Sequence, residues 1–261
     1  MPQSLVESNA PPLGVSAAGV VADTVVRVLG GKRVLDGLEL HVPTQGRIGI
    51  VGRSGAGKST LLSLVAGLDD PDAGTVSVGG AVAARERLAH CALMPQRDCL
   101  LPWRTALDNA GLALENAGLP RREARRRAAP LFARFGLADA ELLRPAKLSS
   151  GMRQRVAFLR TLLADKPVLL LDEPFGALDA ITRAELQEWL AGALAAEPRT
   201  VLLVTHDVEE ALLLCERVLV LAAGRVAAEL EADVPRAGPR REIVTTPAFI
   251  ELRERALEAI G

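Results

Sequence analysis

A glycine-rich stretch between an apolar run and a helical pattern limits the fold more than any other part of the sequence. Residues 52–60 read Gly-Arg-Ser-Gly-Ala-Gly-Lys-Ser-Thr and fit G-x-x-x-x-G-K-[S/T]. The apolar run Ile48–Val51 precedes this stretch, and apolar residues at helical spacing follow it from Leu61 to Leu68. Glycines there let backbone N–H groups surround phosphate oxygens, and the new helix points its positive end at the same charge. The sequence therefore predicts a nucleoside triphosphate site. Its expected residues are Gly52, Arg53, Ser54, Gly55, Ala56, Gly57, Lys58, Ser59 and Thr60.

Two acids follow a second apolar run and complete the predicted chemistry. Val168–Leu171 is followed by Asp172 and Glu173, and ligands bind at the carboxyl edge of a parallel sheet. In this pattern Lys58 reaches the β- and γ-phosphates, while Ser59 and Asp172 hold Mg²⁺, the acid through water. Glu173 is expected to polarise the attacking water as a general base. The alternative for the two acids is an ordinary strand end before Pro174.

Short apolar runs predict a mostly parallel sheet. Most are continuous rather than alternating, which is typical of strands buried on both faces. The runs are Ile48–Val51, Ala92–Met94, Val168–Leu171, Val201–Val204 and Val218–Leu221. The stretch from Pro95 to Leu148 is different, because prolines interrupt it and arginines crowd residues 121–134. We expect it to form an inserted helical lobe, with the arginines on a solvated helix face or against a membrane partner or lipid headgroups.

Composition narrows the function classes. With 31 Lys+Arg against 32 Asp+Glu the net charge is −1, so no global field attracts nucleic acid, and none is expected as a partner. No apolar run approaches the roughly 20 residues of a membrane-spanning helix. Residues 1–18 have no signal-peptide pattern and are expected to form a flexible tail. The three cysteines and three histidines show no metal-binding spacing, and we expect reduced thiols.

One further motif identifies a family. Residues 148–155 read Leu-Ser-Ser-Gly-Met-Arg-Gln-Arg, and about the length of one helix separates them from Asp172. They resemble the signature motif of ABC ATPases, which has the same spacing. The resemblance covers residues 20–230. It implies an α/β P-loop NTPase core with a small antiparallel β part near the N-terminus and an inserted α-helical lobe. The expected divisions are the tail 1–18, the core 19–94 and 157–230, the helical lobe 95–156 and a C-terminal extension 231–261.

The resemblance also implies further site residues. Gln96 is expected to reach Mg²⁺ and the attacking water, and His206 in Val204–Asp207 to contact the γ-phosphate. Asp179, in Ala177–Asp179, lies in the nucleotide site of such proteins. The family binds each ATP between two chains arranged head to tail, so a homodimer with two shared sites is implied. The residues that would close over the ATP of the second copy are Ser149, Ser150, Gly151 and Met152.

The chain departs from the family pattern in two places. The usual signature is Leu-Ser-Gly-Gly-Gln, whereas here Ser150 replaces the first glycine and Met152 the glutamine. Ser150 adds a Cβ atom and Met152 removes an amide, so the alternative to a fully active cassette is a weakly active or asymmetric one. The chain has no tyrosine, and the position of the adenine-stacking aromatic falls near Val28 or Leu29. Because base stacking contributes roughly 1–3 kcal/mol in nucleic-acid binders, we expect weaker discrimination between ATP and GTP.

Two stretches resemble one group of importers. Residues 100–105 and 174–183 look like the cassettes of nitrate, sulfonate and taurine importers, a group that includes uptake systems for thiamine-pyrimidine precursors. This implies an ATPase subunit, using ATP and Mg²⁺, on the cytoplasmic face of the membrane. Its partners would be a transmembrane permease and, indirectly, a solute-binding protein. Trp103 either docks the permease or packs inside the helical lobe. The alternatives are a soluble ABC ATPase of repair or translation, and an assembly subunit with little turnover.

Overall fold

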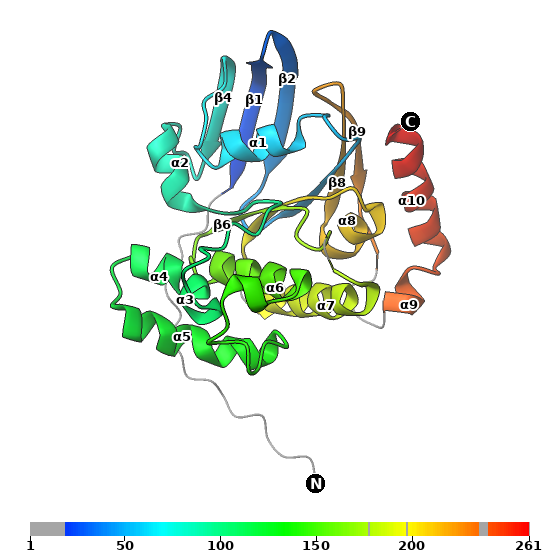
Figure 1. Cartoon of the computed structure of the whole chain (residues 1–261). Coiled ribbons are helices and arrows are strands. Elements are labelled where there is room, and N and C mark those ends of the chain that lie inside the picture. The colour runs from blue at the N-terminus through cyan, green and yellow to red at the C-terminus, as the bar shows by residue number, and fades with distance from the viewer. Residues whose placement is uncertain (1–18, 177, 197, 235–239, 261) are drawn as a thin grey trace.

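A computed structural model describes residues 19–176, 178–196, 198–234 and 240–260. The predicted tail 1–18 and Ala177 lie outside these residues. Two sheets and a set of helices make up the described chain (Figure 1). The smaller sheet is three-stranded and antiparallel, in the order β2-β1-β4. Its strands are β1 (Val20–Leu29), β2 (Lys32–Val42) and β4 (Ala73–Val78).

The larger sheet is six-stranded and mostly parallel. Its order is β5-β6-β7-β3-β8-β9, and only the edge strand β9 runs antiparallel, to β8. The strands are β3 (Arg47–Val51), β5 (Cys91–Met94), β6 (Val168–Asp172), β7 (Thr200–Val204), β8 (Arg217–Ala222) and β9 (Arg225–Glu231). All five predicted apolar runs are strands of this sheet. Continuous runs form here because helices cover both faces of the sheet.

In chain order, the helices of the described residues lie between the strands of the large sheet and after β9. They are α1 (Lys58–Val65), α2 (Ala84–His90), α3 (Ala106–Ala110), α4 (Leu112–Asn116), α5 (Arg121–Arg134), α6 (Ser150–Leu162), α7 (Ala180–Ala196), α8 (Val208–Leu214), α9 (Arg240–Ile243) and α10 (Pro247–Ile260), with a 3₁₀ turn at Pro145–Lys147. The first helix is shorter than its apolar pattern predicted. It ends at Val65, and Leu68 lies beyond it with 59% of its surface exposed. Gly67 causes the stop, since its left-handed backbone (φ 71°) ends the helix.

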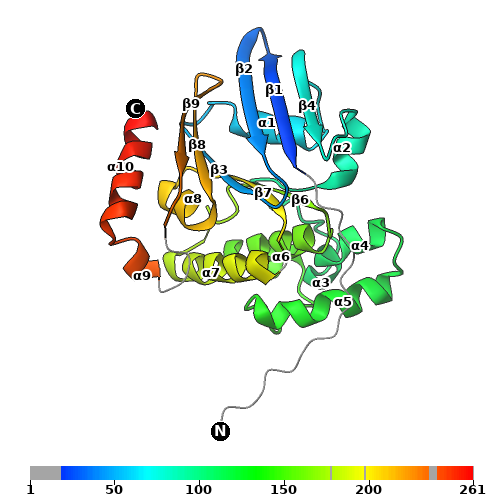
Figure 2. The ribbon, with the colours of Figure 1, turned by 180° about the vertical axis from the view of Figure 1, so that it is seen from behind.

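Side chains of the central strands alternate between two separate cores. Val168 and Leu170 of β6 share a core with Leu61 of α1, in the layer between the two sheets. Leu169 and Leu171 share the other core with α6 and α7. Both views place α1 and α6 on opposite sides of the six-stranded sheet (Figures 1 and 2). This layering decides where the site residues lie.

The helical lobe packs on the second of these cores. Phe132 of α5, Phe135 at the end of α5 and Phe158 of α6 are almost fully buried. The rings of Phe135 and Trp189 of α7 are in contact, with centroids 4.1 Å apart and planes tilted by 60°. Helix α6 runs without a break from Ser150 to Leu162, so the expected boundary at residues 156/157 lies inside one helix. The lobe and the sheet therefore share α6.

The C-terminal helices pack on the other end of the sheet. Phe249 and Ala256 of α10 are fully buried in a third core, which includes residues of α8 and β8. Arg253 of α10 and Arg240 of α9 both pair with Glu209 at the start of α8. No helix among the described residues is long and apolar enough to cross a bilayer.

Candidate functional site

The phosphate loop joins β3 to α1 in a conformation that only glycine adopts without strain. Gly52, Gly55 and Gly57 have positive φ angles of 154°, 79° and 103°. A Cβ atom at Gly52 would lie 2.2 Å from the carbonyl oxygen of Leu221, and one at Gly57 would lie 2.8 Å from that of Val34. Both positive φ and close backbone packing therefore require glycine at these two positions.

Lys58 lies over this loop. Its side chain is 8% exposed, and its Nζ donates to the carbonyl oxygens of Gly52 at 2.7 Å and Arg53 at 3.0 Å. Burial lowers the pKa of Lys58, while the charges of Glu173 and Asp172 oppose this shift. The ammonium group is thus held at the N-terminus of α1, next to the two acids. Such a place suits a group that neutralises phosphate charge.

The two acids lie at the carboxyl end of β6 and have different surroundings. Asp172 is 8% exposed, and burial raises its pKa, although a hydrogen bond with Ser59 acts in the opposite direction. Glu173 turns away from the strand with φ +48°, while its N–H still donates to the carbonyl oxygen of Val204 at 2.8 Å. Asp172 is therefore buried beside Ser59 of the loop, whereas the Glu173 side chain is 22% exposed at the sheet edge.

Three predicted catalytic side chains lie together, with Gln96 and His206 on either oxygen of the Glu173 carboxylate. Gln96 Nε2 donates to Glu173 Oε2 at 3.0 Å, and His206 Nδ1 lies 3.5 Å from Glu173 Oε1. Gln96 follows β5, Glu173 follows β6 and His206 follows β7, which are adjacent parallel strands. Their carboxyl ends share one edge of the sheet, so the topology gathers the residues. Among the described residues, no cluster of three histidine, cysteine or acidic side chains suits a metal ion. The hydroxyl and carboxylate of Ser59 and Asp172 are hard oxygen donors, as Mg²⁺ prefers together with phosphate and water.

The signature residues lie apart from this group. Ser149 caps α6 by accepting a hydrogen bond from the N–H of Met152 at 3.1 Å, and Ser150 is exposed. The Met152 side chain packs partly against the helical-lobe core. Because α6 and α1 cover opposite faces of the sheet, the structure does not bring the signature to the phosphate loop of the same chain. Asp179 is exposed and accepts from the N–H of Thr182 at 3.0 Å, which lowers its pKa.

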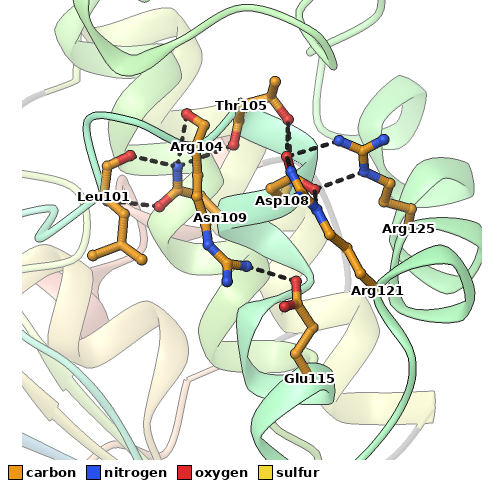
Figure 3. Close-up of polar contacts among 8 residues, drawn as sticks. All are labelled: Leu101, Arg104, Thr105, Asp108, Asn109, Glu115, Arg121 and Arg125. Carbon is orange, nitrogen blue, oxygen red and sulfur yellow. Dashed lines mark hydrogen bonds and ion pairs between the residues drawn. The ribbon is translucent and has the colours of Figure 1, made fainter.

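The arginine-rich helix has a role that the sequence did not indicate. Arg121 and Arg125 of α5 both bond the carboxylate of Asp108 in α3, whose side chain is fully buried (Figure 3). Hydrogen bonds from Arg121 and then Arg125 lower the pKa of Asp108, against the effect of burial. Two of the arginines thus neutralise a buried acid between helices of the lobe. Arg126 and Arg127 instead pair with exposed Glu123.

A polar network holds the loop that carries Trp103. Asn109 accepts from the N–H of Leu101 at 2.7 Å and donates to carbonyl oxygens of Leu101 and Thr105 (Figure 3). Arg104 pairs with Glu115 at 2.6 Å. Trp103 itself is 68% exposed, so the alternative that it packs inside the helical lobe is wrong. A large aromatic residue is therefore displayed on a well-anchored loop.

Comparisons with known proteins agree with this geometry. The family model described as ABC transporter matches residues 35–176. The chain belongs to the ABC transporter family. An aliphatic sulfonates import ATP-binding protein, SsuB, of Pseudomonas putida is 41% identical over 251 residues, which cover 96% of this chain and 90% of that protein. A protein of the same description from Mesorhizobium japonicum is 44% identical over 217 residues, covering 83% and 80%.

Solved structures place the fold in the same family. A dimeric post-hydrolysis state of the ATP-binding cassette MJ0796, bound to ADP and phosphate, superposes with a TM-score of 0.75 at 28% identity. It covers 84% of this chain and all of that one. This chain is accordingly an ABC ATPase that binds ATP and couples its hydrolysis to transport. The predicted family, fold and enzyme class are confirmed.

Several residues that contact the site were not predicted. Thr205 precedes His206 and donates to buried Glu210 at 3.0 Å, and it also accepts from the N–H of Asp207. Gln154 of α6 donates to the carbonyl oxygen of Pro174, next to Glu173, at 3.1 Å. Gln154 stands inside the signature motif, yet nothing in the sequence shows which carbonyl group it meets. These contacts depend on tertiary packing.

Proposed function

We propose that this ATPase powers the uptake of aliphatic sulfonates or similar small anions through a membrane permease. The proposal rests on relatives at 39–44% identity whose descriptions are those of aliphatic sulfonate import proteins. It is narrower than the expected group of nitrate, sulfonate, taurine and thiamine-pyrimidine importers. In this proposal the solute contacts the permease and a solute-binding protein but not this chain, which lies on the cytoplasmic face of the membrane.

The single observation that carries the proposed chemistry is the group of side chains around Glu173. We assign Glu173 as the general base, oriented by Gln96 and by His206, which also contacts the γ-phosphate. Lys58 and the loop residues 52–60 bind the phosphates. Ser59 and Asp172, with Gln96, would hold Mg²⁺, which neutralises phosphate charge when it is bound.

The layering of the fold supports a head-to-tail dimer. Two helix N-termini suited to phosphate, those of α1 and α6, lie on opposite faces of one sheet. One ATP cannot contact both within a chain. We propose that Ser149, Ser150, Gly151 and Met152 of one chain close over ATP in the other, with Asp179 near the same interface. The solved MJ0796 cassettes are dimeric, which supports the pairing of two chains.

The exposed loop of the helical lobe is the proposed permease contact. Trp103 (68% exposed) and Leu142 (74% exposed) lie on segments joined by backbone hydrogen bonds, from Ala106 N–H to Leu143 at 2.7 Å and from Leu107 N–H to Glu141 at 3.0 Å. Exposed tryptophan on an ordered loop is typical of protein interfaces. The solvent-exposed apolar pair suits a permease helix.

Hydrolysis by the assembled complex tests the proposal. We expect Glu173→Gln to keep ATP binding and to lower kcat by at least about 100-fold, because the general base is lost. The measurement is phosphate release by the chain alone and by the complex with its permease, purified through a tag on this chain. Turnover that does not depend on Glu173 would reject the assignment of the base. Recovery of the chain from mildly solubilised membranes without any membrane protein would favour the soluble or assembly role instead.

A further inference from the structure

The position of His206 depends on the backbone that carries it. Its imidazole is 67% exposed and lies 3.5 Å from Glu173 Oε1. An exposed side chain is free to adopt any rotamer that its backbone allows, because no packed neighbours select one. How the imidazole reaches Glu173 is therefore decided largely by the backbone of residues 205–207.

The Thr205 side chain fixes this backbone on both sides of His206. Thr205 directly follows β7, is 1% exposed, and its N–H donates to the carbonyl oxygen of Ile50 at 3.2 Å. Its Oγ1 accepts from the N–H of Asp207 at 3.0 Å, so one hydrogen bond spans His206. A hydroxyl group has a single hydrogen, and here that hydrogen is donated to Glu210 Oε2 at 3.0 Å. The Thr205 rotamer is thus held from two directions.

The same segment is tied to the start of α8. Asp207 is the N-cap of this helix, and its Oδ1 accepts from the N–H groups of Glu209 and Glu210 at 2.9 and 3.2 Å. The Glu210 side chain returns from the first turn of the helix to Thr205. The end of β7 and the beginning of α8 are therefore joined by a closed set of hydrogen bonds around His206.

Glu210 makes this contact as a buried group. It is 3% exposed, and burial raises its pKa to about 8, with Asp207 adding to the shift and Arg183 of α7 and Arg240 of α9 opposing it. The two arginines pair with its neighbours, Arg183 with Asp207 at 3.9 Å and Arg240 with Glu209 at 3.5 Å. A buried acid is least unfavourable when it is protonated and hydrogen-bonded. The surroundings thus favour a neutral carboxyl group that serves Thr205 as a hydrogen-bond partner.

We propose that Thr205 and Glu210 are positioning residues that hold His206 beside Glu173. Both side chains are buried, and they act through His206 rather than on ATP. The inference rests on the proposed role of His206 in the hydrolytic group. A misplaced imidazole leaves phosphate binding by the loop intact but misaligns the groups around the attacking water. Loss of either hydrogen-bonding group should therefore lower kcat and leave the KM for ATP nearly unchanged.

Matched threonine substitutions test the proposal. Thr205→Val keeps the shape of the side chain and removes both hydrogen bonds of the hydroxyl group, whereas Thr205→Ser keeps them. We expect Thr205→Val to lose at least about tenfold in kcat for phosphate release, because catalytic groups must be closely aligned, and Thr205→Ser to keep most of the wild-type kcat. The control is Thr161→Val. Thr161 is also buried, at 4% exposed, but its hydroxyl donates to the carbonyl oxygen of Ala157 within α6 at 3.0 Å, so its loss should lower Tm without changing kcat.

Variants of Glu210 separate hydrogen bonding from charge. Glu210→Gln cannot ionise but keeps a carbonyl oxygen that accepts from Thr205, so it should retain the wild-type kcat near pH 7. Glu210→Leu removes the acceptor and should lower kcat to about the same extent as Thr205→Val. A loss in Glu210→Gln as large as that in Glu210→Leu would reject the neutral acid as the hydrogen-bond partner.

The NMR signals of the imidazole report its position directly. The chain has three histidines, so the signals of His206 can be assigned by comparison with a His206→Ala sample. We expect Thr205→Val to shift these signals, while those of His41 in β2 and His90 in α2 stay in place. A general loss of stability would not shift the signals of one histidine alone.

A titration of the wild type keeps the proposal testable even if Thr205→Val folds poorly. Between about pH 7 and 9 folded Glu210 loses its proton in the wild type, whereas Glu210→Gln has none to lose. The other titrating groups are common to both proteins, so a difference between their titration curves isolates Glu210. We expect the His206 signals of the wild type to move in this interval and those of Glu210→Gln to move less.

Two results would overturn the proposal. One is a folded Thr205→Val protein with wild-type kcat and unshifted His206 signals, or, where that variant does not fold, identical titration curves for the wild type and Glu210→Gln. The other is a Thr161→Val protein that loses as much kcat as Thr205→Val. Glu173-dependent turnover of the wild type is measured in the same preparations. Its absence rejects the proposed function, whereas its presence with an unaffected Thr205→Val rejects only the positioning role.

Discussion

Glu210 is a buried acid close in the chain to the predicted site residue His206. It is 3% exposed, and it accepts from Thr205, which flanks His206. Among the described residues its Oε1 atom has no hydrogen-bond partner. Burial raises the pKa of Glu210 from 4.5 to about 8, with Asp207 adding to the shift and Arg183 and Arg240 opposing it. Burial therefore favours the protonated form of Glu210 in the folded chain.

This shift predicts a dependence of stability on pH. Between pH 4.5 and about 8 unfolded Glu210 is ionised while folded Glu210 keeps its proton, so raising the pH favours the unfolded chain. The contribution of Glu210 to the free energy of unfolding is fully present below pH 4.5 and declines by up to about 1.4 kcal/mol per pH unit until about pH 8. We expect Glu210→Gln, which has nothing to ionise, to flatten the decline. Denaturant unfolding of both proteins at pH 6, 7 and 8 measures this, and parallel curves would contradict it.

Leu29, with its neighbour Val28, is where we expect the adenine of ATP to lie. It is 43% exposed at the end of β1, in a hairpin whose Val34 carbonyl packs against Gly57 of the phosphate loop. We expect Leu29→Tyr to supply the missing ring and to lower the Kd for ATP by roughly 5–150-fold, equivalent to about 1–3 kcal/mol of stacking. Equilibrium binding of ATP and GTP should show tighter binding and a stronger preference for ATP. Val21→Tyr, on the same strand and 41% exposed, serves as the control, and equal effects of the two would reject the placement of adenine.

At the scale of elements, the cluster of Asp108, Arg121 and Arg125 joins α3 to α5, and its acid is much more buried than its two arginines. Asp108 is fully buried, whereas Arg121 and Arg125 are 55% and 38% exposed. Removing both arginines leaves a buried carboxylate unpaired, which is strongly unfavourable. We therefore expect Arg121→Ala with Arg125→Ala to lower Tm by roughly 5–10 °C. Arg126→Ala with Arg127→Ala, which frees only exposed Glu123, should change Tm by less than about 2 °C. Calorimetric scans compare the two, and similar losses would mean that Asp108 does not depend on its partners.

The sequence predicted elements wherever local pattern decided them. Continuous apolar runs became strands, and the loop from Gly52 to Gly57 took its expected place because glycine alone suits that backbone. The roles of side chains whose partners are distant in the sequence could not be predicted. The arginines of α5 look alike in sequence, yet only the position of Asp108 separates Arg121 and Arg125 from their neighbours. For the same reason, the sequence could not decide whether the Trp103 side chain lies inside the helical lobe or on its surface.

At the scale of the molecule, the separation of α1 and α6 determines how active units are built. Each chain carries a complete set of phosphate-loop and acidic residues on one side and a signature on the other. If each ATP site were built from one chain, the signature would have no ligand. If the sites are shared, each chain contributes its phosphate loop and acids to one site and its signature to the other. The two arrangements predict different behaviour of mixed chains.

Mixing two inactive variants distinguishes the shared site from a site within one chain. Lys58→Ala removes the phosphate ligand of a chain but leaves its signature, while Gly151→Asp places a negative charge in the signature but leaves the phosphate loop. In a mixed head-to-tail dimer one site contains both defects and the other contains neither. Equal amounts of the two chains, unfolded together and refolded, should therefore recover about a quarter of the wild-type phosphate release, since half of the dimers each hold one intact site. If each chain used its own signature, every site would carry a defect and mixing would restore nothing.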